Sequence, residues 1–240
     1  MTPQKFQRLL MIFAVVLSFG IGAAAYLDLG QLRSANKDNS LDFFTKVSPF
    51  EGDDDLARMM VLVDIDERSL EKIGQWPWPR SITAELIDRI NAAAPLSIGL
   101  DILMTEEDRF TPQNIARFSG QSADQFEGLV PDGDAILSQS LQNAPTVMAT
   151  NLMPVVVKDP IFAPVGIAQI GQQSQNLITV PGIKSPIPRL QTSPGAGFVS
   201  LSLERDNFVR KVPLMAQVDG KLIPSFALEM LRVGQGARGH

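Results

Sequence analysis

Residues 59–103 read MMVLVDIDERSLEKIGQWPWPRSITAELIDRINAAAPLSIGLDIL, and this stretch decides the fold class that the sequence predicts. It begins with a short apolar run at 59–65, which is typical of a buried strand. Apolar residues then recur at helical spacing from 80 to 94, and Pro95 ends that helix. A second apolar run at 98–103 predicts another buried strand. Strand, helix and strand in this order form a right-handed βαβ unit with two parallel strands.

The rest of the body extends this unit into an α/β domain. We expect, in chain order, a helix capped by Asp132 or Asp134 and ending near Gln142, a strand over 146–151, strands 197–203 and 209–218 joined at 204–207, and a helix over 226–233 capped by Ser225. The polar stretch 105–131 reads as one long loop, a kind of segment that is usually functional or disordered. The predicted fold is α/β, with a mostly parallel central sheet, flanking helices and a late antiparallel hairpin.

The N-terminal stretch 9–27, LLMIFAVVLSFGIGAAAYL, contains no charged residue. As a helix it would be about 28 Å long, close to the thickness of the hydrocarbon core of a bilayer. Lys5 and Arg8 precede it, whereas charges of both signs follow it. The positive-inside rule therefore predicts a single transmembrane helix in a bacterial inner membrane, with residues 1–8 in the cytoplasm and the body in the periplasm.

A cleavable signal peptide is the alternative for this segment, because Ala23, Ala24 and Ala25 offer a small-residue cleavage site. The apolar run is longer than a signal peptide needs, which favours the anchor, and both interpretations export the body. The expected domains are thus a linker at 28–55, an extracytoplasmic body at 56–234 and a tail at 235–240.

Small residues recur every four positions along the predicted membrane helix, at Ala14, Ser18 and Gly22. This spacing allows two membrane helices to approach closely and predicts a homodimer or an effector subunit as partner. Small residues are equally common in any export segment, so the pattern is also explained without a partner.

The composition excludes several classes of chemistry. There is no cysteine, which removes disulfides, thiolate catalysis and Cys-ligated zinc. The one histidine is the last residue, His240, so histidine-based triads and metal sites are not expected. The net charge is −5, and no basic stripe is present, so nucleic acid is not an expected partner. No cofactor is expected.

Several acidic residues are expected where the two predicted parallel strands end. Asp64 and Asp66 lie two apart and so share one face, and Asp101 follows the neighbouring strand. Ligands of open parallel sheets bind beyond the carboxyl ends of the strands. Arg80 is a candidate partner, because its guanidinium binds carboxylates bidentately. The loop that follows adds further carboxylates from Glu106, Glu107 and Asp108.

Two interpretations of this group stay open. In the first, Asp66 and Asp101 pair with Arg80 and backbone amides and fasten the turn before the helix. In the second, the carboxylates line a pocket for a cationic or hydroxylated ligand, and Trp76 and Trp78 form an aromatic wall. Packing of at least one tryptophan against the sheet is the simpler expectation.

An enzyme is the alternative in a different functional class. Asp64 and Asp66 after an apolar strand resemble the nucleophile loop of metal-dependent phosphatases of the haloacid dehalogenase type. Those enzymes have Thr or Val two residues after the second Asp, where this chain has Arg68. A structural membrane-anchored subunit is a third possibility, and it would work through the N-terminal helix alone.

Two sets of motifs together resemble the second type of CHASE domain, the cyclase- and histidine-kinase-associated sensory extracellular family. The first set is VLVDID at 61–66, WPWPR at 76–80, GLDI at 99–102 and EED at 106–108, and the second is GFV at 197–199, VRKVPL at 209–214 and IPSFA at 223–227. The resemblance covers residues 59–232. Met104 and Asn207 depart mildly from the family pattern, and the segment 109–131 is longer than usual.

The resemblance implies an extracytoplasmic sensor of a small-molecule or protein ligand, with no catalysis of its own. Such domains usually precede membrane helices and a cytoplasmic adenylate or guanylate cyclase, histidine kinase or Ser/Thr kinase. The ligand-binding candidates are the residues of the strand ends, the tryptophan turn and the acidic loop, namely Asp64, Asp66, Trp76, Trp78, Arg80, Asp101, Glu106 and Asp108.

Overall fold

The computed structural model describes residues 3–27, 40, 42–48, 59–158, 161–163, 167, 177–201, 209 and 211–237. The chain divides into two compact units, Met1–Ile65 and Asp66–His240. Most of the predicted linker at 28–55 and the predicted turn at 204–207 lie outside the described residues.

The first unit contains one long helix, α1 (Pro3–Tyr26), which confirms the helix expected at 9–27. Its apolar side chains are exposed along the described part of the helix, as at Phe13 and Phe19. A search of the described residues finds no helix whose length and apolarity suffice to cross a membrane. The predicted transmembrane span is therefore not supported.

The apolar run at 59–65 is also in the first unit, and it does not form the strand that we predicted. The side chains of Met59, Met60, Val61 and Leu62 are exposed, Leu62 to 92%. A strand is stable only when a neighbouring strand takes up its backbone hydrogen bonds. The apolar composition of this run indicates a tendency to be buried, but it does not supply that partner.

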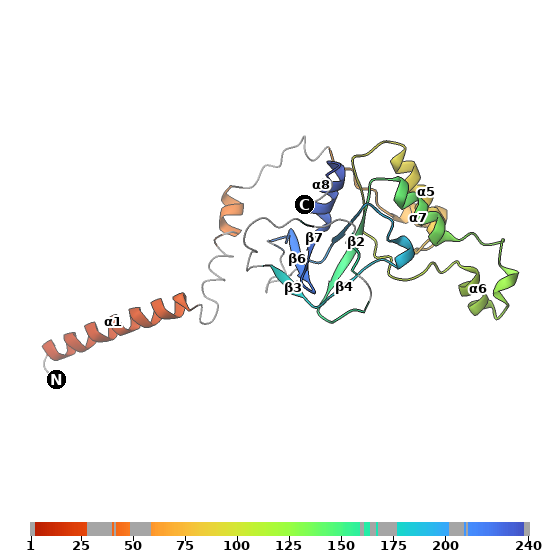
Figure 1. Cartoon of the computed structure of the whole chain (residues 1–240). Coiled ribbons are helices and arrows are strands. Elements are labelled where there is room, and N and C mark those ends of the chain that lie inside the picture. Colours follow the sequence, from red (N-terminus) through yellow and green to blue (C-terminus); the bar gives the residue numbers. More distant parts are fainter. Residues whose placement is uncertain are drawn as a thin grey trace. The chain divides into compact units, whose positions relative to one another are not determined.

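The second unit is built on a mixed sheet around β2 (Thr146–Met153), shown in Figure 1. Two strands run parallel to β2, β1 (Ile98–Leu100) and β5 (Gly195–Phe198). The short strand β4 (Gly182–Lys184) pairs antiparallel with the last residues of β2. The expected α/β fold is present, but the predicted βαβ unit with strands 59–65 and 98–103 is wrong. The parallel pairs of this mixed sheet are β1 with β2 and β2 with β5.

Helices cover both faces of this sheet. They are α5 (Arg80–Asn91) and α7 (Gly133–Asn143), which pack against each other, and α8 (Phe226–Gly234). Their caps agree with the sequence, since Asp132 Oδ1 accepts from Ala135 N at 3.1 Å and Ser225 Oγ accepts from Leu228 N at 3.3 Å. All three helices were predicted.

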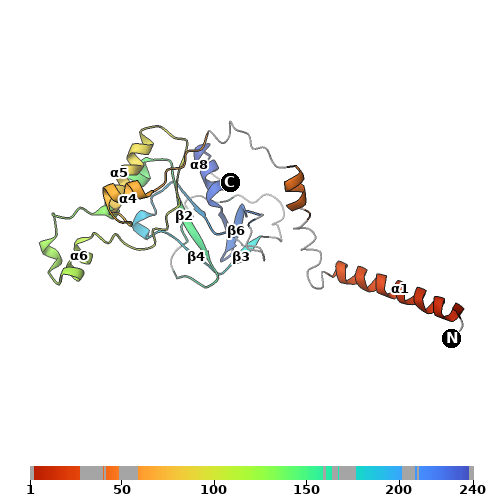
Figure 2. The same ribbon diagram turned by 180° about the vertical axis from the view of Figure 1, so that it is seen from behind.

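Successive residues of β1 face opposite sides of the sheet, and their contacts show which helices cover each side. Ile98 and Leu100 are buried in the same cluster as Ile87 of α5 and Leu137 of α7. Gly99 points to the opposite face, where an added Cβ would come within 2.8 Å of the Phe226 ring of α8. The sheet is thus enclosed between α5 and α7 on one side and α8 on the other, as the two views indicate (Figures 1 and 2).

A second, smaller sheet consists of β3 (Ile178–Val180), β6 (Met215–Val218) and β7 (Lys221–Pro224). The antiparallel hairpin is β6–β7, and its turn is Asp219 and Gly220, with φ of 47° and 75°. Two successive residues of positive φ form the turn that matches strand twist. Within the described residues the predicted pairing of 197–203 with 209–218 is not found, since 195–198 pair with β2 and 215–218 pair with β3 and β7.

Shorter elements complete the second unit, and they were not predicted. They are α4 (Glu67–Ile73), α6 (Pro112–Ser119), and the 3-10 turns η2 (Ala123–Gln125) and η3 (Pro188–Leu190). The segment 105–131 is therefore not one continuous loop. Thr111 caps α6 by accepting from Asn114 N at 3.1 Å, and Gly120 ends it in the left-handed conformation.

Gly197 lies where α8 approaches the central sheet most closely. An added Cβ would come within 2.6 Å of the backbone N and Cα of Phe226, which are fixed at the start of α8. We expect Gly197→Ala to lower the free energy of unfolding by about 3 kcal/mol. Gly234→Ala is the matched control, because its Cβ would meet nothing closer than 3.5 Å. Urea unfolding followed by circular dichroism measures both, and equal stabilities would contradict the expected close approach.

Candidate functional site

The tryptophan turn precedes α5 and packs mainly on itself. The rings of Trp76 and Trp78 meet edge to face, with centroids 5.6 Å apart. Trp78 is buried, and its Nε1 donates to the backbone oxygen of Gly74 at 2.7 Å. Trp78 thus stabilises the turn that leads into α5, and the expected packing of a tryptophan against the sheet stays a prediction.

Asp108 caps α5 from a distant part of the chain. Its Oδ2 accepts from Arg80 N at 2.9 Å, across 28 positions of sequence, and its Oδ1 accepts from Phe110 N at 3.1 Å. Pro79 occupies the N-cap position and makes no side-chain cap hydrogen bond. The free N–H groups at a helix start need an acceptor and favour negative charge. The acidic loop is thereby fixed to the start of α5.

Asp134 lies behind Asp108 and is fully buried. Its Oδ2 accepts from Asp108 N at 3.1 Å, and its Oδ1 lies 3.7 Å from Arg80 Nε without a hydrogen bond in the structure. The guanidinium of Arg80 also donates from Nη2 to Glu106 O at 3.2 Å. We call Arg80, Asp108 and Asp134 the Arg80 cluster.

The electrostatics of the Arg80 cluster follow from its burial. Burial raises the pKa of Asp134, against the hydrogen bond from Asp108 N and the charge of Arg80, which lower it. Burial lowers the pKa of Arg80, against the charges of Asp134 and Asp108. The cluster contains two carboxylates and one guanidinium, so its own three groups carry an excess of negative charge when all are ionised. The charge of Arg189 also acts on Asp134.

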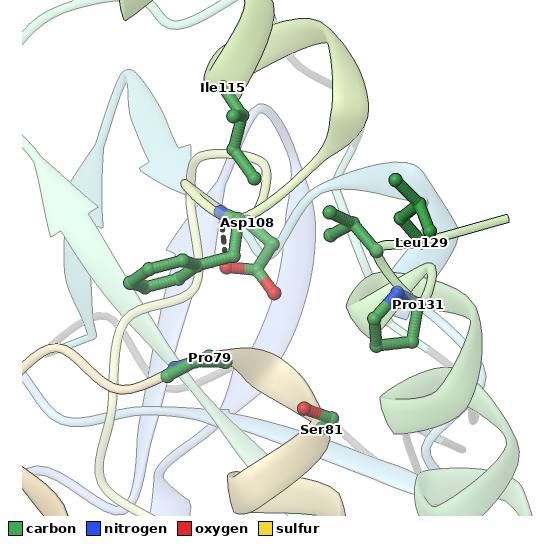
Figure 3. Close-up of a pocket in the computed structure, with 8 residues that line it drawn as sticks. Pro79, Ser81, Asp108, Ile115, Leu129 and Pro131 are labelled. Carbon is green, nitrogen blue, oxygen red and sulfur yellow. Dashed lines mark hydrogen bonds between the residues drawn. The ribbon is translucent and has the colours of Figure 1, made fainter. Parts of the chain in front are cut away.

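A pocket of about 250 Å³ opens beside the Arg80 cluster, between the start of α5 and the segment that carries α6 (Figure 3). It is lined by Pro79, Ser81, Asp108, Phe110, Ile115, Leu129, Val130 and Pro131. Asp108 is the charged member of this set, and most of the other side chains are apolar. Concave, mostly apolar sites with a few polar groups are typical of small-molecule binding.

The structure brings together part of the predicted site. Arg80 and Asp108 meet in the Arg80 cluster, and Glu106 contributes its backbone oxygen. Asp134 completes the cluster and was missed, because the sequence indicated only a helix cap there. The helix cap is Asp132. The sequence signal that could have pointed to Asp134 is that it is a second aspartate, within the first turn of the same helix.

The remaining predicted residues lie elsewhere. Asp66 caps α4, where its Oδ1 accepts from Ser69 N at 2.9 Å and from Ser69 Oγ at 2.7 Å, and these hydrogen bonds lower the pKa of Asp66. Asp64 and Asp101 are exposed. The prediction that Asp66 fastens the turn through Arg80 is therefore wrong, since Asp108 and Asp134 take that place.

The small residues Ala14, Ser18 and Gly22 are exposed on α1. An added Cβ at Gly22 would meet nothing within 4 Å. Their role as a contact with a second helix stays a prediction.

The motifs that carry the resemblance meet at two places in the second unit. WPWPR joins EED through the contact of Arg80 N with Asp108, and GFV joins IPSFA through a bridge between Phe198 and Ser225. A family model described as the CHASE2 domain matches residues 10–239, nearly the whole chain. The chain belongs to the CHASE2 domain family.

No match to this CHASE2 domain was found among the curated proteins or among the solved structures. CHASE2 domains are extracellular sensory domains, so the family describes a sensing role and not a catalytic one. The contact of WPWPR with EED borders the pocket, and the contact of GFV with IPSFA lies where α8 packs on the sheet.

Proposed function

We propose that this CHASE2 domain is the extracytoplasmic ligand-sensing domain of a bacterial membrane receptor. The observation that carries the proposal is the family match over residues 10–239. The receptor is of the kind coupled to an adenylate or guanylate cyclase, a histidine kinase or a Ser/Thr kinase. The pocket beside Asp108 is the ligand site that the geometry supports best.

The proposal places the body in the periplasm and tethers it to the inner membrane through α1. Lys5 and Arg8 before the apolar run, and the exposed apolar side chains along α1, support this arrangement. A second copy or an effector subunit is the proposed partner of the face that carries Ala14, Ser18 and Gly22.

Sensing requires two arrangements of the receptor that bind the ligand with different affinity. The pocket is bounded by the start of α5 on one side and by the segment around α6 on the other. A ligand that contacts both would favour the arrangement in which these two segments are held together.

A pair of reporter fusions tests the placement on which the proposal depends. We expect alkaline phosphatase fused after His240 to be active in cells, because this enzyme folds only outside the cytoplasm, and the matching β-galactosidase fusion to be inactive. Deleting residues 1–27 should reverse both readouts. Recovery of the full-length fusion in the membrane fraction would favour the tether over a cleaved signal peptide. An active β-galactosidase fusion would refute an extracytoplasmic sensor.

A further inference from the structure

We propose that the pocket beside Asp108 binds a small organic cation, a protonated amine carried on a compact apolar body. This inference rests on the proposed function for its biological role, but the binding itself can be measured on the isolated chain.

The charge of the site comes from the Arg80 cluster. Asp108 and Asp134 are 4% and 0% exposed. Arg80 is the guanidinium nearest to them, and the charge of Arg189 also acts on Asp134. Arg80 directs its side chain to Asp134 and Glu106 O, and only its backbone N–H binds Asp108. Among the described residues, the hydrogen bonds to the Asp108 carboxylate come from backbone N–H groups and not from a cationic side chain.

Asp108 keeps capacity for a ligand. Each of its carboxylate oxygens accepts one backbone N–H, from Arg80 and from Phe110, whereas a carboxylate offers about four acceptor positions. Asp108 lines the pocket, so the unused positions are available from that side. A buried carboxylate is stabilised by a cation that also donates hydrogen bonds to it.

The mostly apolar residues that line the pocket determine the size and polarity of the rest of the ligand. Figure 3 shows Asp108 at the centre of the pocket, with Ile115 above it, Leu129 and Pro131 to one side and Ser81 below. Phe110 also lines the pocket, and its backbone N donates to Asp108 Oδ1. A cation beside a carboxylate and an aromatic ring gains from both. A volume of about 250 Å³ limits the ligand to on the order of ten non-hydrogen atoms.

Other ligand classes fit less well. An anion would be repelled by Asp108 and would find no cationic side chain among the lining residues. A metal ion needs several ligands, and among the described residues no group of three or more Asp, Glu, His or Cys side chains is placed to hold one. The apolar walls and the single carboxylate thus favour an organic ammonium.

Isothermal titration of the full chain in a non-ionic detergent with three probes of one shape tests the inference. The probes are phenethylamine, which is cationic at pH 7, neutral 2-phenylethanol and anionic 3-phenylpropanoate. We expect the amine to bind at least tenfold more tightly than the alcohol, and the anion not to bind. Asp108→Asn should remove this preference, whereas Glu107→Gln, which removes a charge from an exposed position of the same loop, should retain it.

A second variant separates binding from folding, because Asp108 also caps α5. Ile115→Trp fills the pocket from α6 and leaves the cap intact, so it should abolish amine binding with an unchanged circular dichroism spectrum. Binding of the alcohol or the anion as tight as that of the amine, amine binding that survives Ile115→Trp, or no binding of any probe would each overturn the inference. An exported phosphatase fusion without amine binding would refute the inference and leave the proposed function standing.

Discussion

We expect Arg80→Met to lower the free energy of unfolding by about 3 kcal/mol at pH 7. The substitution keeps an unbranched side chain of similar length but removes the cation that lies 3.7 Å from the buried Oδ1 of Asp134. It also removes the donor to Glu106 O. The buried carboxylate of Asp134 then loses its nearest counter-charge and keeps only the weaker influence of Arg189, and breaking a buried ion pair by removing one partner is strongly destabilising.

The loss should depend on pH in a defined direction. Burial raises the folded-state pKa of Asp134 above its ordinary value of 3.8, so the folded chain holds this proton more tightly than the unfolded chain. Stability therefore falls as the pH rises through the folded-state pKa. Without Arg80 the pKa of Asp134 rises further, so the effect of Arg80→Met should be largest above that pKa and should shrink as the pH falls toward 3.8.

Two further variants isolate the charge effect. Arg89→Met removes an arginine from the same helix, but its ion pair with Glu85 is solvent-exposed, so we expect a change of at most about 0.5 kcal/mol. Adding Asp134→Asn to Arg80→Met should recover part of the lost stability, because a neutral amide replaces the uncompensated carboxylate. Urea unfolding of the unchanged chain and the three variants, in a pH series from 7 down to 3.8, gives the comparison. A loss for Arg80→Met that is independent of pH would show that Asp134 does not carry the effect.

The helices of the second unit could be predicted because their signals are local. Apolar spacing located α5, whereas α7 was located by a cap at Asp132 or Asp134 and α8 by a cap at Ser225. Even α6, which we did not predict, has local signals in Thr111 before a proline and Gly120 after the last turn.

The strand pairings could not be predicted from local sequence. The run at 59–65 has the composition of a strand, but pairing depends on a distant segment that composition does not identify. A strand was predicted at 197–203, whereas the observed strand is 195–198 and pairs with β2, a partner that the sequence did not identify for the same reason. The hairpin turn at Asp219 and Gly220 was missed, although Asp-Gly is a strong local hairpin signal.

The candidate site was predicted in part, again for a physical reason. Arg80 is the first residue of α5, and Asp108 lies on the loop after the next strand, β1. That these two residues lie close together could therefore be predicted from the order of helix and strand. The participation of Asp134 depends on how α7 packs against α5, which is a tertiary contact between residues far apart in sequence. Asp66 was placed with Arg80 from an assumed strand at 59–65, and without that strand it serves as a helix cap.

The second large effect is expected at Arg232, which fastens α8 beneath the sheet. Arg232 Nε donates to Glu229 Oε2 at 2.9 Å and Nη2 to Oε1 at 2.7 Å, and both side chains are almost fully buried. Nη2 also donates to Pro194 O and Nη1 to Ala237 O, each at 2.7 Å. Arg232→Met leaves a buried carboxylate and two backbone oxygens without this donor, so we expect a loss of about 4 kcal/mol.

Arg189→Met is the matched control for this substitution, since the ion pair of Arg189 with Asp132 is half-exposed and should contribute at most about 1 kcal/mol. The double variant Glu229→Leu with Arg232→Met should be more stable than Arg232→Met alone, because no charge is then left buried. Thermal and urea unfolding of the four proteins give the comparison, and equal losses for Arg232→Met and Arg189→Met would contradict the buried pair.

Since α8 packs through Phe226 against Gly99 and Gly197, loosening it at Arg232 should also weaken the contact between GFV and IPSFA. The pocket beside Asp108 lies on the α5 side of the sheet, so amine binding by the folded Arg232→Met variant should stay close to that of the unchanged chain.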